Sequence, residues 1–544
     1  MFVDMVTRPT AHRISSSSSS DGDSLTILIH MRLCAICPLI TTTFPVFYFI
    51  TTTGLSLCPG QISALMTIGL LSITLFNPLT TIACFRCYRQ IAIRIVTCGR
   101  YDSQNREATV SIQQKVHAVP RLLHSQQAAM LSFFSFIFFS TLFAISKSVA
   151  LNSDVGGYTS RKFGSVRESF RNLLAKEREG LALAAYVNGE LVVDLWDGFA
   201  DSSASRKWRE DTMTCVYAVS KLFGYLVVAK LVSDGRLRYE EKVVKYWPEF
   251  GQHGKDVLTV EDLVNHKAGL IGFSEVITIE DVNDLEKLSK IIEQSKPYWK
   301  PGSAVGYHAT TLGFILDQLV RRVDSKQRTV ARFYHDEIRG KETEFYIGLP
   351  KEQFHRFARI TTPSKNENFL SRFRHPLTQI QAFIVSQFNT ENQKLVRVID
   401  NAVPFLSVDK NEIFYNDPDI LAIGNIASTG VGSARGVAKA VLEAFNNNII
   451  SPEMTQLWSQ PTVEVVDIVN GSTILQGHGF LYYPHPVYDK KYLITGVGHG
   501  GQVGLIDTEN NISIALIRNG HRSSFLETLY DLPSQIIRIA LSSE

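Results

Sequence analysis

The chain has 544 residues, more than one ordinary hydrophobic core requires, so two or more structural regions are expected. Its 55 lysine and arginine residues nearly balance 52 acidic residues, and the resulting net charge of +3 argues against a nucleic-acid binder with a broad basic face. Hydrophobic residues make up 45% and charged residues 20%, which excludes a mostly disordered chain. Between Ser24 and Phe85 the only fully charged residue is Arg32, so the two ends of the chain differ sharply in character.

The first part of the chain has the composition of membrane segments. Residues 1–23 contain six consecutive serines and are expected to be disordered. Two apolar runs follow, Leu33–Thr53 and Ile62–Phe85, each long enough to cross a bilayer as a helix of about 20 residues. No polar face interrupts either run, which argues against a buried core helix. Residues 24–86 are therefore predicted to contain two transmembrane helices.

A basic linker and a third apolar run come next. Residues 87–129 are rich in arginine and are expected to lie in the cytoplasm, because positively charged loops stay on that side. The run Leu131–Ile145 is short for a membrane span but typical of the apolar core of a signal peptide, and Ser148-Val149-Ala150 has the pattern of a cleavage site. Residues 130–150 are predicted to be a signal peptide or a third membrane segment, with everything after Ala150 extracellular or lumenal, and secreted if cleavage occurs.

The cysteines offer no convincing metal site. Two CxxC pairs, Cys34 to Cys37 and Cys84 to Cys87, have a spacing typical of zinc sites, but both lie in or beside apolar runs with no compact polar domain to house an ion. No metal or cofactor is expected, and Cys87 is interpreted as a free or acylated thiol. Cys215 has no partner in the last 394 residues, which excludes a disulfide framework there.

Residues 151–544 are predicted to form one mixed α/β domain. Asn188-Gly189 between apolar runs is a two-residue hairpin signal, and a second hairpin is predicted from Gln502–Asp507 and Ile512–Arg518. Apolar periodicity predicts helices at Ser220–Asp234, Val260–Asn265, Thr311–Val323, Ala434–Asn446 and Ser524–Leu541. Strands near both ends with helices between them predict an antiparallel sheet built from both ends of the domain, flanked by helices and carrying a helical insertion.

Several motifs in this region occur in one characteristic order. They are Tyr217-Ala218-Val219-Ser220-Lys221, Tyr246-Trp247-Pro248-Glu249-Phe250, Thr259–Leu270, Trp299-Lys300-Pro301-Gly302, Tyr307-His308-Ala309 and Gly498-His499-Gly500-Gly501-Gln502. From about Phe170 to Leu541 the chain resembles the serine β-lactamase and penicillin-binding-protein family, including its class C and family VIII esterase branches. The match is specific because several motifs agree in sequence order, although each motif alone would be weak.

The resemblance assigns a nucleophile position that this chain does not fill. In the family, a serine three residues before a lysine is activated by that lysine, because residues three apart lie on the same side of a helix. Lys221 has the lysine position, and Ala218 has the serine position. A methyl group cannot attack a carbonyl, so the acyl-enzyme route is closed at residue 218. Ser220 is adjacent to Lys221 and would point about 100° away from it on a helix.

Two further motifs resemble the family's proton-transfer residues. Tyr307 matches the tyrosine of a Tyr-x-Asn element, whose hydroxyl relays protons, while Ala309 replaces the asparagine. His499 stands where the family has the lysine of a Lys-Thr-Gly strand, for which a His-x-Gly form is a known variant. The resemblance implies that His499 contacts a substrate carboxylate or assists proton transfer.

The same resemblance implies a set of substrate contacts. Gly501 would let the backbone approach a ligand closely, and the N–H groups of Gln502 and residue 218 would form an oxyanion hole. His308 is assigned to the substrate side of the site. A structural role for His308 stays open, as it does for the scattered His266, His355, His478 and His485.

These residues predict a catalytically impaired homologue with a ligand-binding or regulatory role. Its pocket would accept a small acyl, ester or peptide-like ligand. The alternative is an active carboxylesterase, peptidase or β-lactamase-like hydrolase that uses another hydroxyl, such as that of Ser220.

The N-terminal region carries a different resemblance. Leu75–Thr81 and Cys87-Tyr88-Arg89 are similar to the last transmembrane helix and tail of nematode serpentine chemoreceptors, within residues 24–100. Two spans are too few for a signalling receptor. Residues 1–129 are therefore interpreted as a receptor fragment joined to a secreted protein, by gene fusion or by a faulty gene model.

The domain after Ala150 is predicted to enter the secretory pathway and to carry N-linked glycan. Asn470-Gly471-Ser472 and Asn511-Ile512-Ser513 are the two acceptor sequences in this part of the chain. Expression in secretory cells should give a product whose electrophoretic mobility shifts after glycosidase treatment. A product that stays in the cytosol and does not shift would contradict this location.

Overall fold

The computed structural model describes residues 155–363, 390–408, 413–446, 450–522 and 529–542. The predicted membrane helices, basic linker and signal peptide lie outside these ranges. Within the described ranges, every helix is too short or too polar to span a bilayer.

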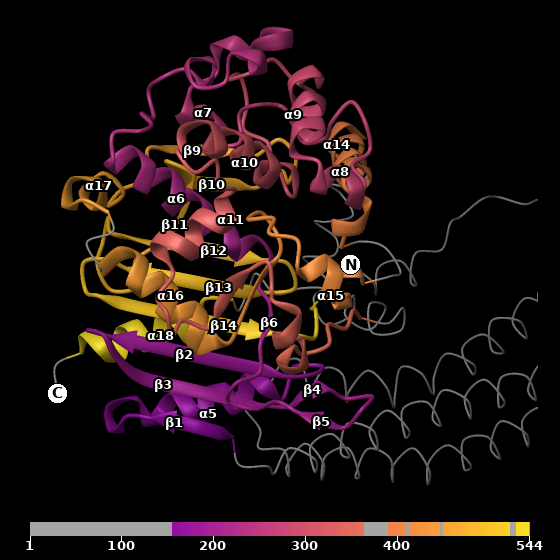
Figure 1. Cartoon of the computed structure of the whole chain (residues 1–544). Helices are drawn as coiled ribbons and strands as arrows, with labels where there is room; N and C mark the ends of the chain where they lie inside the picture. Colours follow the sequence, from indigo (N-terminus) through magenta and orange to yellow (C-terminus); the bar gives the residue numbers. More distant parts are fainter. Residues whose placement is uncertain (1–154, 364–389, 409–412, 447–449, 523–528, 543–544) are drawn as a thin grey trace, which may run out of the picture. The chain divides into compact units, whose positions relative to one another are not determined.

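An antiparallel sheet forms the centre of the described domain (Figure 1). Nine strands of the described ranges pair in the order β1-β3-β2-β14-β13-β12-β11-β10-β9. From the N-terminal end come β1 (Gly156–Thr159), β2 (Leu181–Val187) and β3 (Glu190–Asp197). From the C-terminal end come β9 (Val463–Val466), β10 (Thr473–Gly477), β11 (Phe480–Pro484), β12 (Tyr492–Gly498), β13 (Gln502–Asp507) and β14 (Ile512–Arg518). Because β2 pairs with β14, the prediction of one sheet built from both ends is confirmed.

The two predicted hairpins form with the expected turns. Asn188 and Gly189 both have positive φ angles, 52° and 86°, as a two-residue turn that follows the twist of its strands requires. The second hairpin joins β13 to β14 at the predicted residues. The two turns meet at the same end of the sheet, where the backbone N–H of Asn188 donates to the carbonyl of Asn511 at 2.9 Å.

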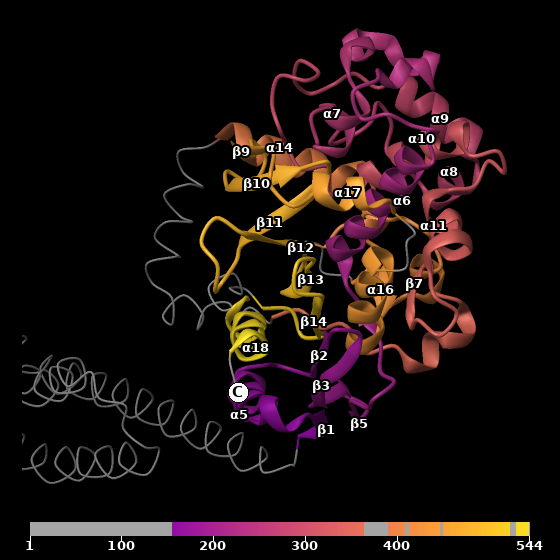
Figure 2. The ribbon, with the colours of Figure 1, turned by 90° about the vertical axis from the view of Figure 1, so that its left-hand side faces the viewer.

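Helices cover both faces of the sheet (Figure 2). On one face lie α5 (Gly164–Leu174) and α18 (Asp531–Leu541), packed on buried leucines such as Leu183 and Leu516. On the other lie α6 (Lys221–Ser233) and α16 (Ala434–Asn446), where small residues such as Ala184 and Ala515 line the sheet. A sheet buried on both faces has nearly continuous apolar strands, as β14 shows.

The residues between β3 and β9 form the helical insertion and smaller sheets. Its described helices include η3 (Tyr217–Ser220), α6, α7 (Val260–Val264), α8 (Ile279–Asn283), α9 (Leu285–Gln294), α10 (Thr311–Val323), α11 (Val330–Phe333), α14 (Thr390–Ala402), α15 (Pro418–Leu421), α16 and α17 (Pro452–Leu457). Two small sheets join β4 (Phe199–Asp201) to β5 (Arg206–Lys207), and β6 (Thr214–Cys215) and β7 (Phe345–Ile347) to β8 (Gly430–Gly432). The predicted helix Ser220–Asp234 corresponds to α6, and the 3₁₀ turn η3 directly precedes it.

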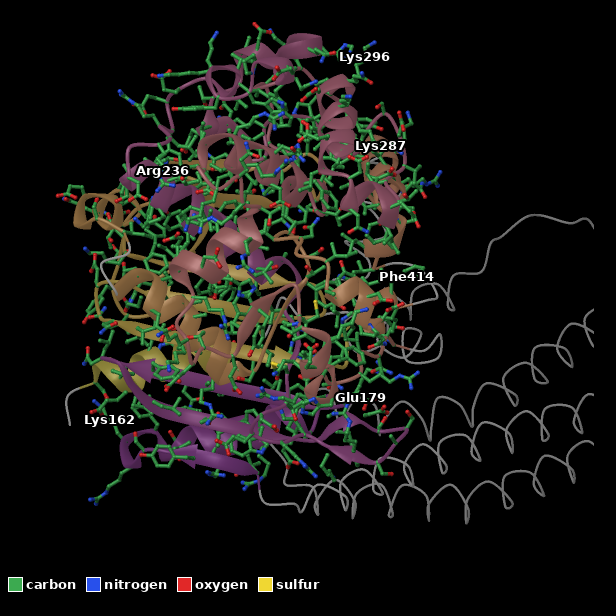
Figure 3. The ribbon with its side chains drawn as sticks, in the orientation of Figure 1. Lys162, Glu179, Arg236, Lys287, Lys296 and Phe414 are labelled. Carbon is green, nitrogen blue, oxygen red and sulfur yellow. The ribbon has the colours of Figure 1, made fainter. Side chains whose placement is uncertain are left out.

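The C-terminal helix begins later than predicted. The expected start at Ser524 lies outside the described residues, but Leu529 and Tyr530 form a turn and α18 begins at Asp531. Pro533 explains the start, since proline is tolerated only in the first turn of a helix. Lys162, at the surface in Figure 3, donates from Nζ to the carbonyls of Ala540 and Ser542 at 3.2 and 2.9 Å and satisfies the end of this helix.

Candidate active site

The turn that precedes α6 places residues 218 and 221 on the same side. Tyr217–Ser220 form a 3₁₀ turn, in which side chains three residues apart eclipse one another. The Ala218 methyl is partly exposed, whereas Lys221 is buried with 5% of its surface accessible. Ser220 is fully buried, and its hydroxyl donates to the carbonyl of Tyr217.

The Lys221 amine forms three hydrogen bonds that join separate parts of the chain. Its Nζ atom lies 2.9 Å from the Tyr307 phenol oxygen, 2.7 Å from the Ala309 carbonyl oxygen and 2.7 Å from the Ala427 carbonyl oxygen. The first two acceptors belong to the loop that precedes α10, and the third belongs to the segment before β8. The structure therefore brings the predicted lysine and tyrosine into direct contact.

Burial favours the uncharged forms of this pair. It lowers the pKa of Lys221 well below the usual range, and burial, with the charge of Asp467 as a smaller cause, raises the pKa of Tyr307. A neutral amine can donate its two N–H groups to the two carbonyls and accept the phenol proton on its lone pair. This arrangement uses every polar group of the amine without an acidic partner.

Two buried histidines hold the Tyr307 loop. The N–H of His308 donates to Nδ1 of His266 at 3.1 Å, and Nε2 of His266 lies 3.1 Å from the hydroxyl of Tyr225 on α6. His308 itself is 1% exposed: its Nε2 accepts from the N–H of Leu270 at 2.9 Å, and its Nδ1 lies 2.7 Å from the carbonyl of Gly306. Burial lowers the pKa of His308 to about 4 and that of His266 well below its usual range, which favours the neutral form of both rings.

Glycines in the β12–β13 hairpin let the Tyr217 turn lie directly against the sheet. A Cβ atom on Gly498 would stand 2.2 Å from the carbonyl oxygen of Val216, and one on Gly504 would stand 2.9 Å from the Val219 side chain. Any larger residue there would push the turn away. Close packing thus brings the partly exposed His499 next to the turn that carries Ala218.

His499 belongs to an aromatic cluster beneath this turn. Its ring packs edge-on against Tyr217, with 5.6 Å between centroids, and against His521, with 4.7 Å. Tyr217 has a positive φ of 48° and a buried ring, and it also contacts Tyr415. The cluster links the predicted His499 to the turn rather than to the Lys221 amine.

Among the predicted substrate contacts, the side chains of Gln502 and His308 are buried and bonded to backbone groups, whereas Gly501 has no side chain to offer. The Gln502 side chain is fully buried and bonded to the backbone of Arg518 through both its oxygen and its nitrogen, at 2.8 Å each. It locks β13 to β14, so the Gln502 side chain is not available to a ligand. Gly501 lies in the hairpin loop with a φ of 98°, which favours glycine. His308 faces backbone groups through both ring nitrogens, as described above.

Sequence reasoning missed the carbonyl of Ala427 and the residue that directs it. Asn425 accepts from the N–H of Ala427 at 2.8 Å and donates to the carbonyl of Thr310 at 3.2 Å, which connects this segment to the start of α10. A backbone acceptor has no side-chain signature, so no sequence pattern could have revealed it. Within the described ranges, no group of three or more His, Cys, Asp or Glu residues is arranged to hold a metal ion.

Comparison with known proteins agrees with the motifs and with this geometry. Residues 166–531 match the family described as Beta-lactamase. The chain belongs to this family. Over 380 residues it is 27% identical to the esterase/beta-lactamase LipL of Mycobacterium tuberculosis, an alignment that covers 67% of this chain and 83% of that protein.

Solved structures of the family have the same architecture. A family VIII carboxylesterase is 25% identical, with a TM-score of 0.60 over 72% of this chain and 100% of that one. EstA from Arthrobacter nitroguajacolicus Rue61a is 27% identical, with a TM-score of 0.58 over 70% of this chain and 98% of that one. The domain is therefore a β-lactamase-like α/β domain.

Replacement of Lys221 by methionine should destabilise the domain, because the amine is bonded inside the fold. Methionine fills similar space but leaves the carbonyls of Ala309 and Ala427 without their donor, and each lost buried partner costs about 1–3 kcal/mol. We expect the free energy of unfolding, measured in urea, to fall by about 2–4 kcal/mol.

Lys230 on the same helix is the matched control. It forms a partly exposed ion pair with Asp234, and such pairs contribute about 0–1 kcal/mol. Lys230→Met should therefore change stability by less than about 1 kcal/mol. An equal fall in the free energy of unfolding for the two variants would show that the hydrogen bonds of Lys221 stabilise the domain no more than a surface ion pair does.

Proposed function

We propose that this β-lactamase-family protein binds a small acyl, ester or peptide-like ligand without forming an acyl-enzyme. The observation that carries the proposal is Ala218 at the position one 3₁₀ turn before Lys221. The Lys221–Tyr307 pair, the His499 loop and the backbone donors surround that position, so a ligand carbonyl would still meet polar groups there. In triad hydrolases, loss of one member leaves only about 10³–10⁴-fold catalysis over water, which favours binding or regulation over turnover.

The hydrogen bonds of the Lys221 amine support this role, because all three are made within the protein. They end on a phenol and two carbonyls, and none of them depends on a hydroxyl at residue 218. The lysine therefore keeps a structural function after the loss of a nucleophile. Tyr307, Ala309 and His499, like Ala218, remain partly exposed to an incoming ligand.

The competing proposal, a hydrolase that uses Ser220, has less support. The Ser220 hydroxyl is buried and donates to the Tyr217 carbonyl. Its Cβ atom packs against β8, because a Cβ on Gly430 would stand only 2.6 Å from it. Ser220 would need a different backbone register to reach a ligand carbonyl.

The relatives suggest the chemistry of the ligand. LipL and the family VIII carboxylesterase are named for action on esters, and the first is also named as a β-lactamase. Ligands of this class present a carbonyl carbon with an electronegative leaving group. The oxyanion donors that we propose, the N–H groups of Ala218 and Gln502, would hydrogen-bond the carbonyl oxygen.

An extracellular or lumenal location is part of the same proposal. Asn470 is exposed in the turn between β9 and β10, as an acceptor for glycan should be. Asn511 is half-buried with a φ of 53° in the tight turn before β14, which makes it the poorer acceptor of the two.

The wild-type protein should not react with a fluorophosphonate probe, and Ala218→Ser should become labelled. The new hydroxyl would lie one turn from the Lys221 amine, whose pKa burial lowers well below its usual range. The amine can therefore accept the serine proton in place of its hydrogen bond from Tyr307, and the backbone donors do not depend on the side chain. Intact-mass and peptide mass spectrometry of both proteins would locate the adduct at position 218 of the variant.

Two further variants make the labelling result specific. Ala218→Ser with Lys221→Met should lose the label, since the base is gone, whereas Ala218→Ser with Ser220→Ala should keep it. An adduct on Ser220 of the wild-type protein would support the hydrolase instead. Adducts on neither protein would show that residue 218 no longer faces a functional site.

A further inference from the structure

His521 is a buried histidine with two unbonded ring nitrogens. It follows the end of β14, and 3% of its surface is accessible. Neither Nδ1 nor Nε2 has a hydrogen-bond partner among the residues that the structure describes. A polar group that is buried without a partner destabilises the folded state. The presence of this imidazole therefore needs a reason other than the stability of the fold.

Other buried histidines of the domain use both of their nitrogens. Nδ1 of His485 accepts from two backbone N–H groups at 3.1 and 3.0 Å, and its Nε2 lies 3.0 Å from a carboxylate oxygen of Asp507. His266 and His308 are also bonded through both nitrogens, as described above. Burial in this fold therefore does not by itself deprive a histidine of partners.

The backbone around His521 is held firmly in place. The N–H of His521 donates to the carbonyl of Thr361 at 2.8 Å, and the N–H of Thr361 donates to the carbonyl of Asn519 at 2.9 Å. The Asn519 side chain bonds four further backbone groups at 2.9, 3.2, 3.1 and 2.8 Å. An unbonded side chain on so rigid a base is typical of a residue that is kept for binding.

The imidazole lies beside the turn that carries residue 218. It packs edge-on against Tyr217, with 5.3 Å between centroids, and against His499, with 4.7 Å. The buried hydroxyl of Tyr217 also has no partner within the described part of the chain. A Cβ atom on Gly500 would stand 2.4 Å from Cδ2 and 3.1 Å from Nε2 of His521. The ring edge that carries Nε2 therefore faces the hairpin loop of the proposed ligand site.

We propose that His521 binds the ligand of the candidate site by hydrogen bonds to an amide group next to the ligand's ester-like carbonyl. The inference rests on the proposed function and adds a residue that lies outside every motif of the family resemblance. A neutral imidazole offers one donor and one acceptor, and an amide offers the complementary acceptor and donor. An alkyl chain of the same length offers neither.

The protonation state of the ring favours an amide over a carboxylate. Burial, with smaller contributions from His499 and from two nearby arginines, lowers the pKa of His521 to about 3. The imidazole is therefore neutral at neutral pH and carries no charge that would attract a carboxylate. A carboxylate would also leave the N–H acceptor side of the ring unused, because an ionised carboxylate only accepts hydrogen bonds.

The glycine-rich hairpin loop controls access to the ring. The backbone of Gly500 lies against the Nε2 edge, so a ligand reaches this nitrogen when the loop shifts. Gly500 and Gly501 have φ angles of 76° and 98°, in a region that glycine adopts without strain. The loop can therefore change conformation where other residues would resist.

Two matched esters test the inference on the full-length chain. Methyl N-acetylglycinate and methyl pentanoate have acyl chains of equal length, and only the first carries an amide. Their dissociation constants can be measured by ligand-observed NMR titration. His521→Phe should weaken binding of the amide-bearing ester about tenfold, as expected for a lost hydrogen bond, and should leave methyl pentanoate unchanged. His521→Gln, whose side-chain amide keeps a donor and an acceptor, should retain the stronger binding of the first ester.

Stability gives an independent measurement, with His485 as the matched control. His521→Phe removes two unbonded nitrogens, so the variant should unfold at a higher urea concentration than the wild-type protein. His485→Phe removes bonded nitrogens and takes a partner from Asp507, so it should unfold at a lower concentration and leave the binding of both esters unchanged. If the phenyl ring does not fit, His521→Leu gives the same comparison with a shorter apolar side chain.

Three results would overturn the inference. Unfolding of both His521→Phe and His521→Leu at lower urea concentrations would show that the nitrogens are bonded within the fold. Equal effects of His521→Phe on the two esters would leave the ring with a packing role alone. Binding of neither ester to the wild-type protein would overturn the proposed function as well, whereas the first two results leave that function intact.

Discussion

Three hydrogen bonds to one buried amine hold separate segments of the insertion together. The Lys221 amine joins the start of α6 to the Tyr307 loop and to the segment that leads into β8. Each acceptor would lose water on folding, so each needs a donor in the interior. A hydroxyl at residue 218 is not among these partners, whereas loss of the lysine would orphan the carbonyls of Ala309 and Ala427. These bonds therefore make Lys221 and Tyr307 structural requirements of the fold.

Burial favours the uncharged forms of the titratable side chains around the site. Burial lowers the pKa of His308 to about 4 and that of His521 to about 3, and it lowers the pKa of His266 well below the usual range. Burial favours the uncharged forms of Lys221 and Tyr307 as well, so these groups act as hydrogen-bond donors and acceptors. The proposed ligand, with an ester or amide carbonyl, would meet oriented dipoles there.

The sequence by itself indicated the hairpins and the main helices, and it predicted that Lys221 and Tyr307 lie together. These features depend on residues close together in the sequence, so they can be recognised without the fold. They include Asn188-Gly189, the periodic apolar residues of Thr311–Val323 and the motifs around Lys221 and Tyr307. The presence of Ala218 where the family resemblance expects a serine is equally local, because it needs only the spacing to Lys221. Pro533 also carried a local signal, which places the start of α18 later than its apolar pattern suggested.

Only the tertiary structure decided which distant groups complete the site. The Ala427 carbonyl has no side-chain signature, so no pattern in the sequence marks it as a partner of Lys221. His308 and Gln502 sit inside the expected motifs, yet packing turns their side chains toward the backbone of Leu270 and of Arg518. Hydrogen bonds between segments more than a hundred residues apart depend on how the layers stack, and no local pattern encodes that stacking.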